Sequence, residues 1–140
     1  MLYDDNYYMN IAYKEAIKAY KKDEIPVGVV LVLNNKIIAR AHNLRDSSNI
    51  VTKHAEIIAI EKANKKIRNW RLINFTLYTT LEPCDMCREV IKEAKIENVV
   101  YGAKSNKLNN SGFKQINSRE MICLCESLIK NKFNELRNKQ

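Results

Sequence analysis

The chain has 140 residues, 46% of them hydrophobic, and a formal net charge of +8 from 24 basic and 16 acidic residues. This length and composition suit one domain with its own core, and only three Gly and two Pro occur that could mark a linker. No window approaches the roughly 20 apolar residues of a membrane span, and residues 1–5 lack the basic opening of a secretory signal. We therefore expect a single cytoplasmic domain over residues 1–140 that does not associate with membranes.

Hydrophobic periodicity divides the chain into alternating helices and strands. Apolar positions spaced by three or four residues indicate amphipathic helices, and short apolar runs bounded by turn residues indicate strands. Polar loops are expected over 43–52 and 105–118. In chain order, the other expected elements are a helix over 5–22, strands over 28–33 and 36–41, a helix over 53–67, a strand over 75–81, a helix over 84–95, a strand over 97–102 and a helix over 119–139. This order predicts a three-layer α/β domain with a mixed central sheet flanked by helices.

The positive charge is concentrated near the C-terminus. From Lys104 onward there are eight basic and three acidic residues, so the last 37 residues carry +5 of the total +8. Such a segment suits a polyanionic partner, because phosphate contacts often dominate nucleic-acid affinity. A lysine-rich solvated surface without a specific partner explains the same composition equally well.

Two short motifs carry the chemistry: His54-Ala55-Glu56 and Pro83-Cys84-Asp85-Met86-Cys87. His54, Cys84 and Cys87 offer one nitrogen and two thiolates to a zinc ion. Structural zinc sites are usually closed by four protein ligands, whereas catalytic sites use three and leave the fourth position for water. Three ligands with a carboxylate beside them therefore favour hydrolysis over a zinc finger.

Each motif is expected at or just before the start of a helix, where backbone N–H groups and the helix dipole create positive potential. This potential favours the thiolate form of Cys84 and Cys87, whose i, i+3 spacing places both sulfurs on one face of the first turn. Glu56 lies two residues after His54, about 200° around a helix, so the two are not expected to be neighbouring ligands. Glu56 is better placed to contact the metal's water or the substrate.

Four further residues have less certain roles. His42 could be a fourth metal ligand, but at the end of a strand it is better explained by packing or by contact with RNA. Asn43 either closes the following loop or contacts a ligand. Cys123 and Cys125 lie two apart in an expected helix, where they do not face each other, and we predict that both are buried, inert thiols.

An H-x-E motif followed by P-C-x-x-C, with a strand between them, is the signature of zinc-dependent nucleobase deaminases. Over residues 5–104 the chain resembles the bacterial tRNA-specific adenosine deaminases of the cytidine and deoxycytidylate deaminase superfamily. Besides the two motifs, the phrases that carry the resemblance are Glu24-Ile25-Pro26-Val27-Gly28, His42-Asn43, Arg71-Leu72-Ile73, Thr76-Leu77-Tyr78 and Val100-Tyr101-Gly102-Ala103.

This resemblance implies a cytidine-deaminase-like fold with a sheet of about five strands, a catalytic core over 5–104 and a basic loop and helix over 105–140. It also implies a homodimer that converts adenosine to inosine at the first anticodon (wobble) position of an arginine tRNA. By resemblance, each subunit holds one Zn²⁺ and Glu56 moves protons. The remaining implied roles are metal binding by His54, Cys84 and Cys87, and contact with the target nucleotide by Asn43 and Ala55.

Two other functions stay open. A deaminase of a free base or nucleoside, such as cytosine, cytidine or guanine, is disfavoured by the basic C-terminal segment, which a small neutral substrate does not need. A non-catalytic, zinc-stabilised RNA-binding module would require a fourth protein ligand at the metal.

The chain departs from the family pattern at two places. Arg88-Glu89 replace the usual small residues, and Ser105 stands where Asp is usual. The segment before the last helix is also shorter than in the family, which predicts an abbreviated or missing fifth strand.

Overall fold

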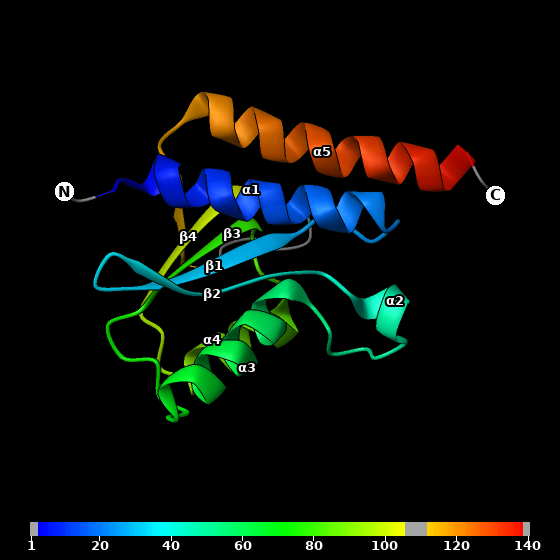
Figure 1. Cartoon of the computed structure of the whole chain (residues 1–140). Helices are drawn as coiled ribbons and strands as arrows, with labels where there is room; N and C mark the ends of the chain where they lie inside the picture. The colour runs from blue at the N-terminus through cyan, green and yellow to red at the C-terminus, as the bar shows by residue number, and fades with distance from the viewer. Residues whose placement is uncertain (1–2, 106–111, 139–140) are drawn as a thin grey trace.

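A computed structural model describes residues 3–105 and 112–138 of the chain. These residues form a central sheet between two layers of helices (Figure 1). The elements, in chain order, are α1 (Asp5–Lys21), β1 (Gly28–Leu33), β2 (Lys36–His42), α2 (Arg45–Ser48), α3 (Ala55–Ile67), β3 (Thr76–Leu81), α4 (Asp85–Glu93), β4 (Asn98–Ala103), β5 (Lys114–Gln115) and α5 (Arg119–Asn138).

The sheet has five strands in the order β2-β1-β3-β4-β5. β1 runs antiparallel to β2 and β3, whereas β3, β4 and β5 are parallel to one another. The prediction of a mixed sheet of about five strands is therefore confirmed. β5 has only two residues, so the fifth strand is abbreviated, and it lies inside the segment expected to be a loop.

The two faces of the sheet are covered by different helices. Along β1, Val29 and Leu31 pack in a cluster with α3 and α4, whereas Val30 and Val32 pack in a cluster with α1. Figure 1 shows α1 and α5 on one side of the sheet and α3 and α4 on the other. Burial on both faces explains why β1 is a continuous apolar run rather than an alternating one.

Close packing of α1 on the sheet depends on Gly28. A Cβ atom at Gly28 would lie 1.9 Å from the carbonyl oxygen of Ala12, on the buried face of α1. Because no side chain stands at this position, the helix backbone can approach the start of β1 directly. The C-terminal half of α1 is thereby brought beside the end of β2.

The last helix is attached to α1 through a buried lysine. The side chain of Lys132 on α5 is only 2% exposed, and its Nζ lies 3.0 Å from Asp23 Oδ1 and 3.1 Å from Glu135 Oε2. The same ammonium lies 4.0 Å from the centre of the Tyr20 ring, a cation–π contact. These contacts hold α5 alongside the end of α1.

Several element boundaries differ from the predictions by one or two residues, and the largest change lies before α3. The polar loop expected over 43–52 contains the short helix α2, and the helix expected over 53–67 begins only at Ala55. In the parts of the chain that the structure describes, no helix combines the length and the apolarity that crossing a membrane requires.

Candidate metal centre and active site

The three predicted metal ligands meet where α3 and α4 begin. His54 is the N-cap residue of α3, Cys84 is the N-cap residue of α4, and Cys87 lies in the first turn of α4. His54 Nδ1 lies 3.7 Å from Cys84 Sγ and 3.5 Å from Cys87 Sγ. A tetrahedral zinc ion, with Zn–N near 2.0 Å and Zn–S near 2.3 Å, separates nitrogen and sulfur by about 3.5 Å. The donor set therefore fits zinc in both chemistry and spacing.

The pKa values of the two thiol groups are shifted in opposite directions. Hydrogen bonds with Cys87 and His54 lower the pKa of Cys84 to about 3, so this sulfur is a thiolate at neutral pH. The hydrogen bond to Cys84, together with burial, raises the pKa of Cys87. A bound divalent cation supplies the positive charge that makes the second thiolate favourable.

Among the described residues, the group of potential metal ligands consists of His54, Cys84 and Cys87. His42 is not part of this group, since its ring nitrogens contact Glu15 and Lys22. Three protein ligands match the catalytic rather than the closed structural type of zinc site.

The prediction for the other two cysteines is only half correct. Cys125 is buried against Gly102, but Cys123 is exposed to solvent. Residues two apart on a helix point to nearly opposite sides, so burial of one thiol leaves the other facing water.

Glu56 lies in the same pocket as His54 and Cys84. Glu56 and His54 were predicted not to be neighbouring ligands on the assumption that both are helical, whereas His54 has an extended backbone, with φ −79° and ψ 150°. The helix begins one residue later, and the two side chains therefore line one pocket. Glu56 is 4% exposed, and this burial raises its pKa to about 7. A carboxyl group with such a pKa can both accept and donate a proton near neutral pH.

The pocket has a volume of about 340 Å³, within the size range of small-molecule sites. Its walls are formed by residues at the ends of the central strands, at the helix starts and on α5. The lining residues are Ile25, Val27, Asn43, Arg45, His54, Ala55, Glu56, Leu81, Glu82, Cys84, Lys104, Ser105, Ile129 and Phe133. Asn43 and Ala55, predicted to contact the substrate, are thus in the pocket with the metal centre.

The pocket also contains residues that the sequence predictions did not include. Arg45 and Lys104 place two cationic side chains on it from α2 and from the end of β4. Ile129 and Phe133 reach the pocket from α5, although β4 and β5 separate this helix in the chain from α4, where the second motif lies. Their i, i+4 spacing indicated in the sequence that Ile129 and Phe133 lie on one face of the helix, but it did not indicate what this face contacts.

Two buried oxygen atoms in the pocket wall are available to a ligand. Asn43 Oδ1 and Glu82 Oε2 are buried and have no hydrogen-bond partner among the described residues. The second polar atom of each side chain already makes a hydrogen bond. Asn43 Nδ2 donates to the Ile25 carbonyl, and Glu82 Oε1 accepts from the Ser105 N–H. Because buried acceptors are normally satisfied, both oxygens are suited to donors of a bound ligand.

A fully buried carboxylate supports the rim of the pocket. Glu24 accepts hydrogen bonds from the backbone N–H groups of Asp46 and Ser47 and from the Ser47 hydroxyl. Burial alone would raise the pKa of Glu24, but the hydrogen bonds from Ser47 and Asp46 outweigh it and lower the pKa. The carboxylate thus holds α2, and with it Arg45, at the pocket.

Sequence comparisons identify the family. Residues 2–103 match the cytidine and deoxycytidylate deaminase zinc-binding region. The tRNA-specific adenosine deaminase of Bacillus subtilis (strain 168) is 49% identical over 108 residues, which cover 77% of this chain and 67% of that protein. The tRNA-specific adenosine deaminase of Buchnera aphidicola subsp. Schizaphis graminum is 44% identical over 109 residues, covering 78% of this chain and 72% of that protein.

Solved structures show the same fold. A structure from studies of A-to-I editing by tRNA:A34 deaminases has a TM-score of 0.71 and 43% identity, covering 73% of this chain and 78% of that chain. The guanine deaminase of Bacillus subtilis also has a TM-score of 0.71, with 33% identity, covering 80% of this chain and 72% of that chain. The chain therefore belongs to the zinc-binding cytidine and deoxycytidylate deaminase family, and it has the cytidine-deaminase-like fold.

Proposed function

We propose that this protein is a zinc-dependent hydrolytic deaminase that converts adenosine to inosine at the wobble position of a tRNA and releases ammonia. The observation that carries the reaction type is the meeting of Glu56 with His54, Cys84 and Cys87 around one pocket. Support for the substrate comes from relatives named tRNA-specific adenosine deaminase, which are up to 49% identical to this chain. A small domain of this family with that degree of identity is expected to retain the relatives' reaction.

In the proposed site, His54, Cys84 and Cys87 hold one Zn²⁺. When bound, the ion lowers the pKa of a coordinated water to about 7, which supplies a nucleophile at neutral pH. The thiolates of Cys84 and Cys87 are soft donors and the imidazole nitrogen of His54 is a borderline one, so this donor set favours zinc over magnesium or calcium.

Glu56 moves the protons of the reaction. It receives the proton that water loses when the water oxygen bonds to C6 of the adenine, and it donates this proton to N1. A second proton then passes from the new hydroxyl group through Glu56 to the amino group. The C6–N6 bond breaks, ammonia leaves, and the base retains a carbonyl at C6 and a hydrogen on N1. The raised pKa of Glu56 supports both directions of transfer.

Asn43 and Ala55 hold the target nucleotide. The free Asn43 Oδ1 accepts a hydrogen bond from the substrate, and the small, fully buried Ala55 leaves room for the flat face of a base. A nucleotide stacked in an RNA loop must leave the stack to enter such a pocket. Arg45 and Lys104 on the pocket suit the phosphates of the flanking strand.

The finer features of the proposal rest on the resemblance described above. They are an arginine tRNA as the substrate, a homodimer as the active form and the cytoplasm as the place of action. Inosine formation in an arginine-tRNA anticodon stem-loop, compared with stem-loops from other tRNAs with adenosine at the same position, tests the substrate. The oligomeric state follows from sedimentation of the zinc-loaded protein over a range of concentrations.

Replacing Glu56 tests the mechanism. In Glu56→Gln, we expect inosine formation in an anticodon stem-loop to fall by at least about 100-fold, because general acid–base catalysis is lost. Zinc content should stay at one ion per chain, since Glu56 is not proposed as a ligand. Glu61→Gln, on the exposed face of the same helix, is the matched control and should keep full activity. Undiminished inosine formation in Glu56→Gln would refute the proposed role.

A second candidate is the deamination of a free base. It is favoured by the structural similarity to the guanine deaminase of Bacillus subtilis, at 33% identity. Ammonia release from a panel of free bases and nucleosides, together with no inosine formation in RNA, would select this alternative.

A further inference from the structure

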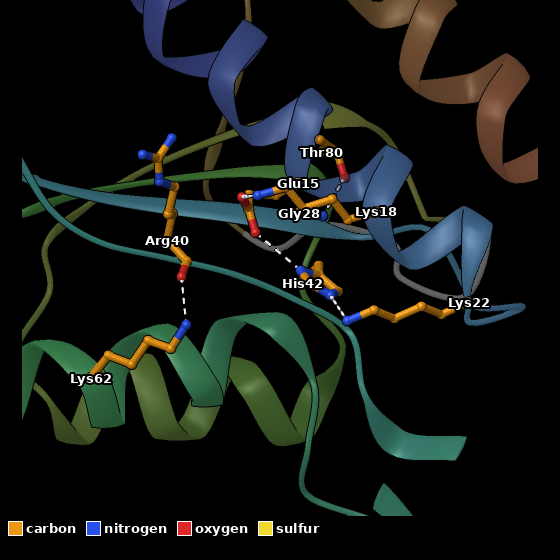
Figure 2. A network of polar contacts seen from close by, with 8 residues as sticks. All are labelled: Glu15, Lys18, Lys22, Gly28, Arg40, His42, Lys62 and Thr80. Atoms are coloured by element: carbon orange, nitrogen blue, oxygen red, sulfur yellow. Dashed lines mark hydrogen bonds and ion pairs between the residues drawn. The ribbon is translucent and has the colours of Figure 1, made fainter. Parts of the chain in front are cut away.

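A polar network joins the end of β2 to α1 beside the pocket (Figure 2). His42 immediately precedes the pocket residue Asn43. Its side chain lies between Glu15, which belongs to α1, and Lys22, which is the C-cap residue of α1. His42 Nδ1 lies 3.0 Å from Glu15 Oε1, and His42 Nε2 lies 2.9 Å from Lys22 Nζ. The imidazole ring therefore connects a carboxylate to an ammonium group.

The two partners determine which nitrogen of His42 carries the hydrogen. A carboxylate can only accept a hydrogen bond, and an ammonium group can only donate one. Nδ1 must therefore carry the hydrogen donated to Glu15, while Nε2 is bare and accepts from Lys22. The ring thus links the head group of Lys22 to the carboxylate of Glu15 through two hydrogen bonds.

Glu15 is suited to accept the hydrogen bond from His42 Nδ1. It is only 5% exposed, and its second carboxylate oxygen accepts from Lys18 Nζ at 2.7 Å. Burial alone would raise the pKa of Glu15, but the hydrogen bonds with Lys18 and His42 outweigh it and lower the pKa. The carboxylate is thus ionised at neutral pH and continues to accept from His42.

Lys22 combines an exposed position with a fixed head group. The residue is exposed, yet one N–H of its ammonium is directed to His42, which leaves the other two N–H groups for an outside acceptor. Lys22 lies three residues before Ile25, which lines the pocket. Its ammonium group contacts His42, the residue before Asn43. The end of α1 that it occupies lies at the same end of the sheet as α2 (Figure 1).

We propose that Glu15 and His42 position Lys22 as an anchor for a backbone phosphate of the RNA strand that enters the pocket. The inference rests on the proposed function, because the phosphate belongs to the RNA substrate of that function. Lys22 then adds a third cation, from α1, to Arg45 of α2 and Lys104 at the end of β4. An ammonium already held in place loses less conformational freedom on binding than a free lysine side chain.

The salt dependence of RNA binding tests the anchor. Binding of an anticodon stem-loop to zinc-loaded protein is measured at several salt concentrations, for the wild type and for Lys22→Gln. Loss of one phosphate contact in a single-stranded loop should reduce the slope of log K against log [salt] by about 0.7. Lys36→Gln removes the same charge at the far end of the β1–β2 hairpin, and its slope should equal that of the wild type.

The positioning role of His42 is tested through its coupling to Lys22. In His42→Phe the charge of Lys22 is kept but its acceptor is lost, and we expect RNA affinity to fall about fivefold. In the Lys22→Gln background the same His42→Phe change should have no further effect on affinity. If His42 only supports the fold, it will lower affinity equally in both backgrounds, and this outcome overturns the positioning role.

Steady-state kinetics separates this inference from the proposed function. For Lys22→Gln we expect KM for the stem-loop to rise about fivefold while kcat stays at the wild-type value, since the residue does not touch the reacting atoms. A wild-type protein that binds and deaminates the stem-loop, together with an unchanged salt slope in Lys22→Gln, overturns the anchor alone. A wild-type protein that acts on free bases and not on RNA overturns both.

Discussion

At the scale of single residues, the metal centre uses positions that normally stabilise helices. His54 and Cys84 are N-cap residues, but neither side chain makes a hydrogen bond to the helix start. The preferred N-cap residues are Ser, Thr, Asp and Asn, and their replacement costs about 0.5–2 kcal/mol per helix. At α3 and α4 the side chain at this position is directed to the metal site instead. Local stability is thus lower in exchange for a preorganised set of donors.

Replacing Cys87 tests the ligand set at this scale. In Cys87→Ser we expect the loss of bound zinc and, with it, of inosine formation, because a serine hydroxyl is a poor ligand for a site built on thiolates. Metal analysis of the purified protein and the stem-loop assay measure the two effects. Cys123→Ser changes an exposed thiol in the same way and should leave zinc content and activity as they are. Full zinc content in Cys87→Ser would show that Cys87 is not a ligand.

At the scale of elements, two buried carboxylates hold the segments that bear the cations of the pocket. Glu24 accepts hydrogen bonds from the N–H groups of Asp46 and Ser47, which follow Arg45 in α2, and Glu82 accepts from the N–H of Ser105, next to Lys104. α2 has only four residues and none of them is buried, so its own packing contributes little to its position. The buried acceptor compensates for this because it satisfies N–H groups that a helix start leaves free.

The stability contribution of Glu24 should depend on pH. Its pKa is lowered in the folded protein, so its contribution is complete above the unfolded value of 4.5 and is lost as pH falls through the folded value. We expect Glu24→Gln to reduce the free energy of unfolding by about 2 kcal/mol at neutral pH. The difference from wild type should shrink as pH falls below 4.5 and through the lowered folded pKa, where Glu24 itself becomes protonated.

Urea unfolding of both proteins over this pH range measures the difference. Glu89→Gln, on the exposed side of α4, is the matched control and should match the wild type at each pH. A difference between Glu24→Gln and the wild type that stays constant from neutral pH down to the onset of acid unfolding would contradict the role of the ionised carboxylate.

At the scale of the whole molecule, the metal centre joins two helices on one side of the sheet. His54 belongs to the start of α3, and both cysteines belong to the start of α4, after β3. The opposite side is covered by α1 and α5, and α5 reaches the pocket through Ile129 and Phe133. The pocket therefore needs both helix layers in place, and a zinc ion held by His54, Cys84 and Cys87 would connect elements that are distant in the chain.

Removing zinc should lower the thermal stability of the folded chain. A ligand at 1,000 times its dissociation constant stabilises the protein that binds it by about 4 kcal/mol. For a domain of this size, this corresponds to a rise in Tm of roughly 10 °C. Melting curves with added zinc and with a chelator measure the shift. Cys84→Ser should melt at the same temperature in both solutions, and an equal response of this variant would show that the ion acts elsewhere.

Local patterns were sufficient for most of the fold. The apolar run of β1, the Asn34-Asn35 turn and the helical spacing of α3 depend on neighbours in the chain, and each element formed near its predicted place. The two-residue strand β5 was not located, because a pair of residues carries no periodicity. The short helix α2 was missed as well, since its stability comes from the distant carboxylate of Glu24 rather than from its own sequence.

The sequence by itself determined the donor set of this protein: one histidine and two cysteines with zinc-ligand spacing, one carboxylate beside them, and the positions of these residues at two helix starts. Only the tertiary structure decided the surroundings of that chemistry. The approach of α1 to Gly28 brings Glu15 and Lys22 to His42, and the attachment of α5 through Lys132 brings Phe133 to the pocket. Ligand spacing within a motif is set by bonds along the chain, whereas these contacts depend on how separate layers pack, which no local pattern records.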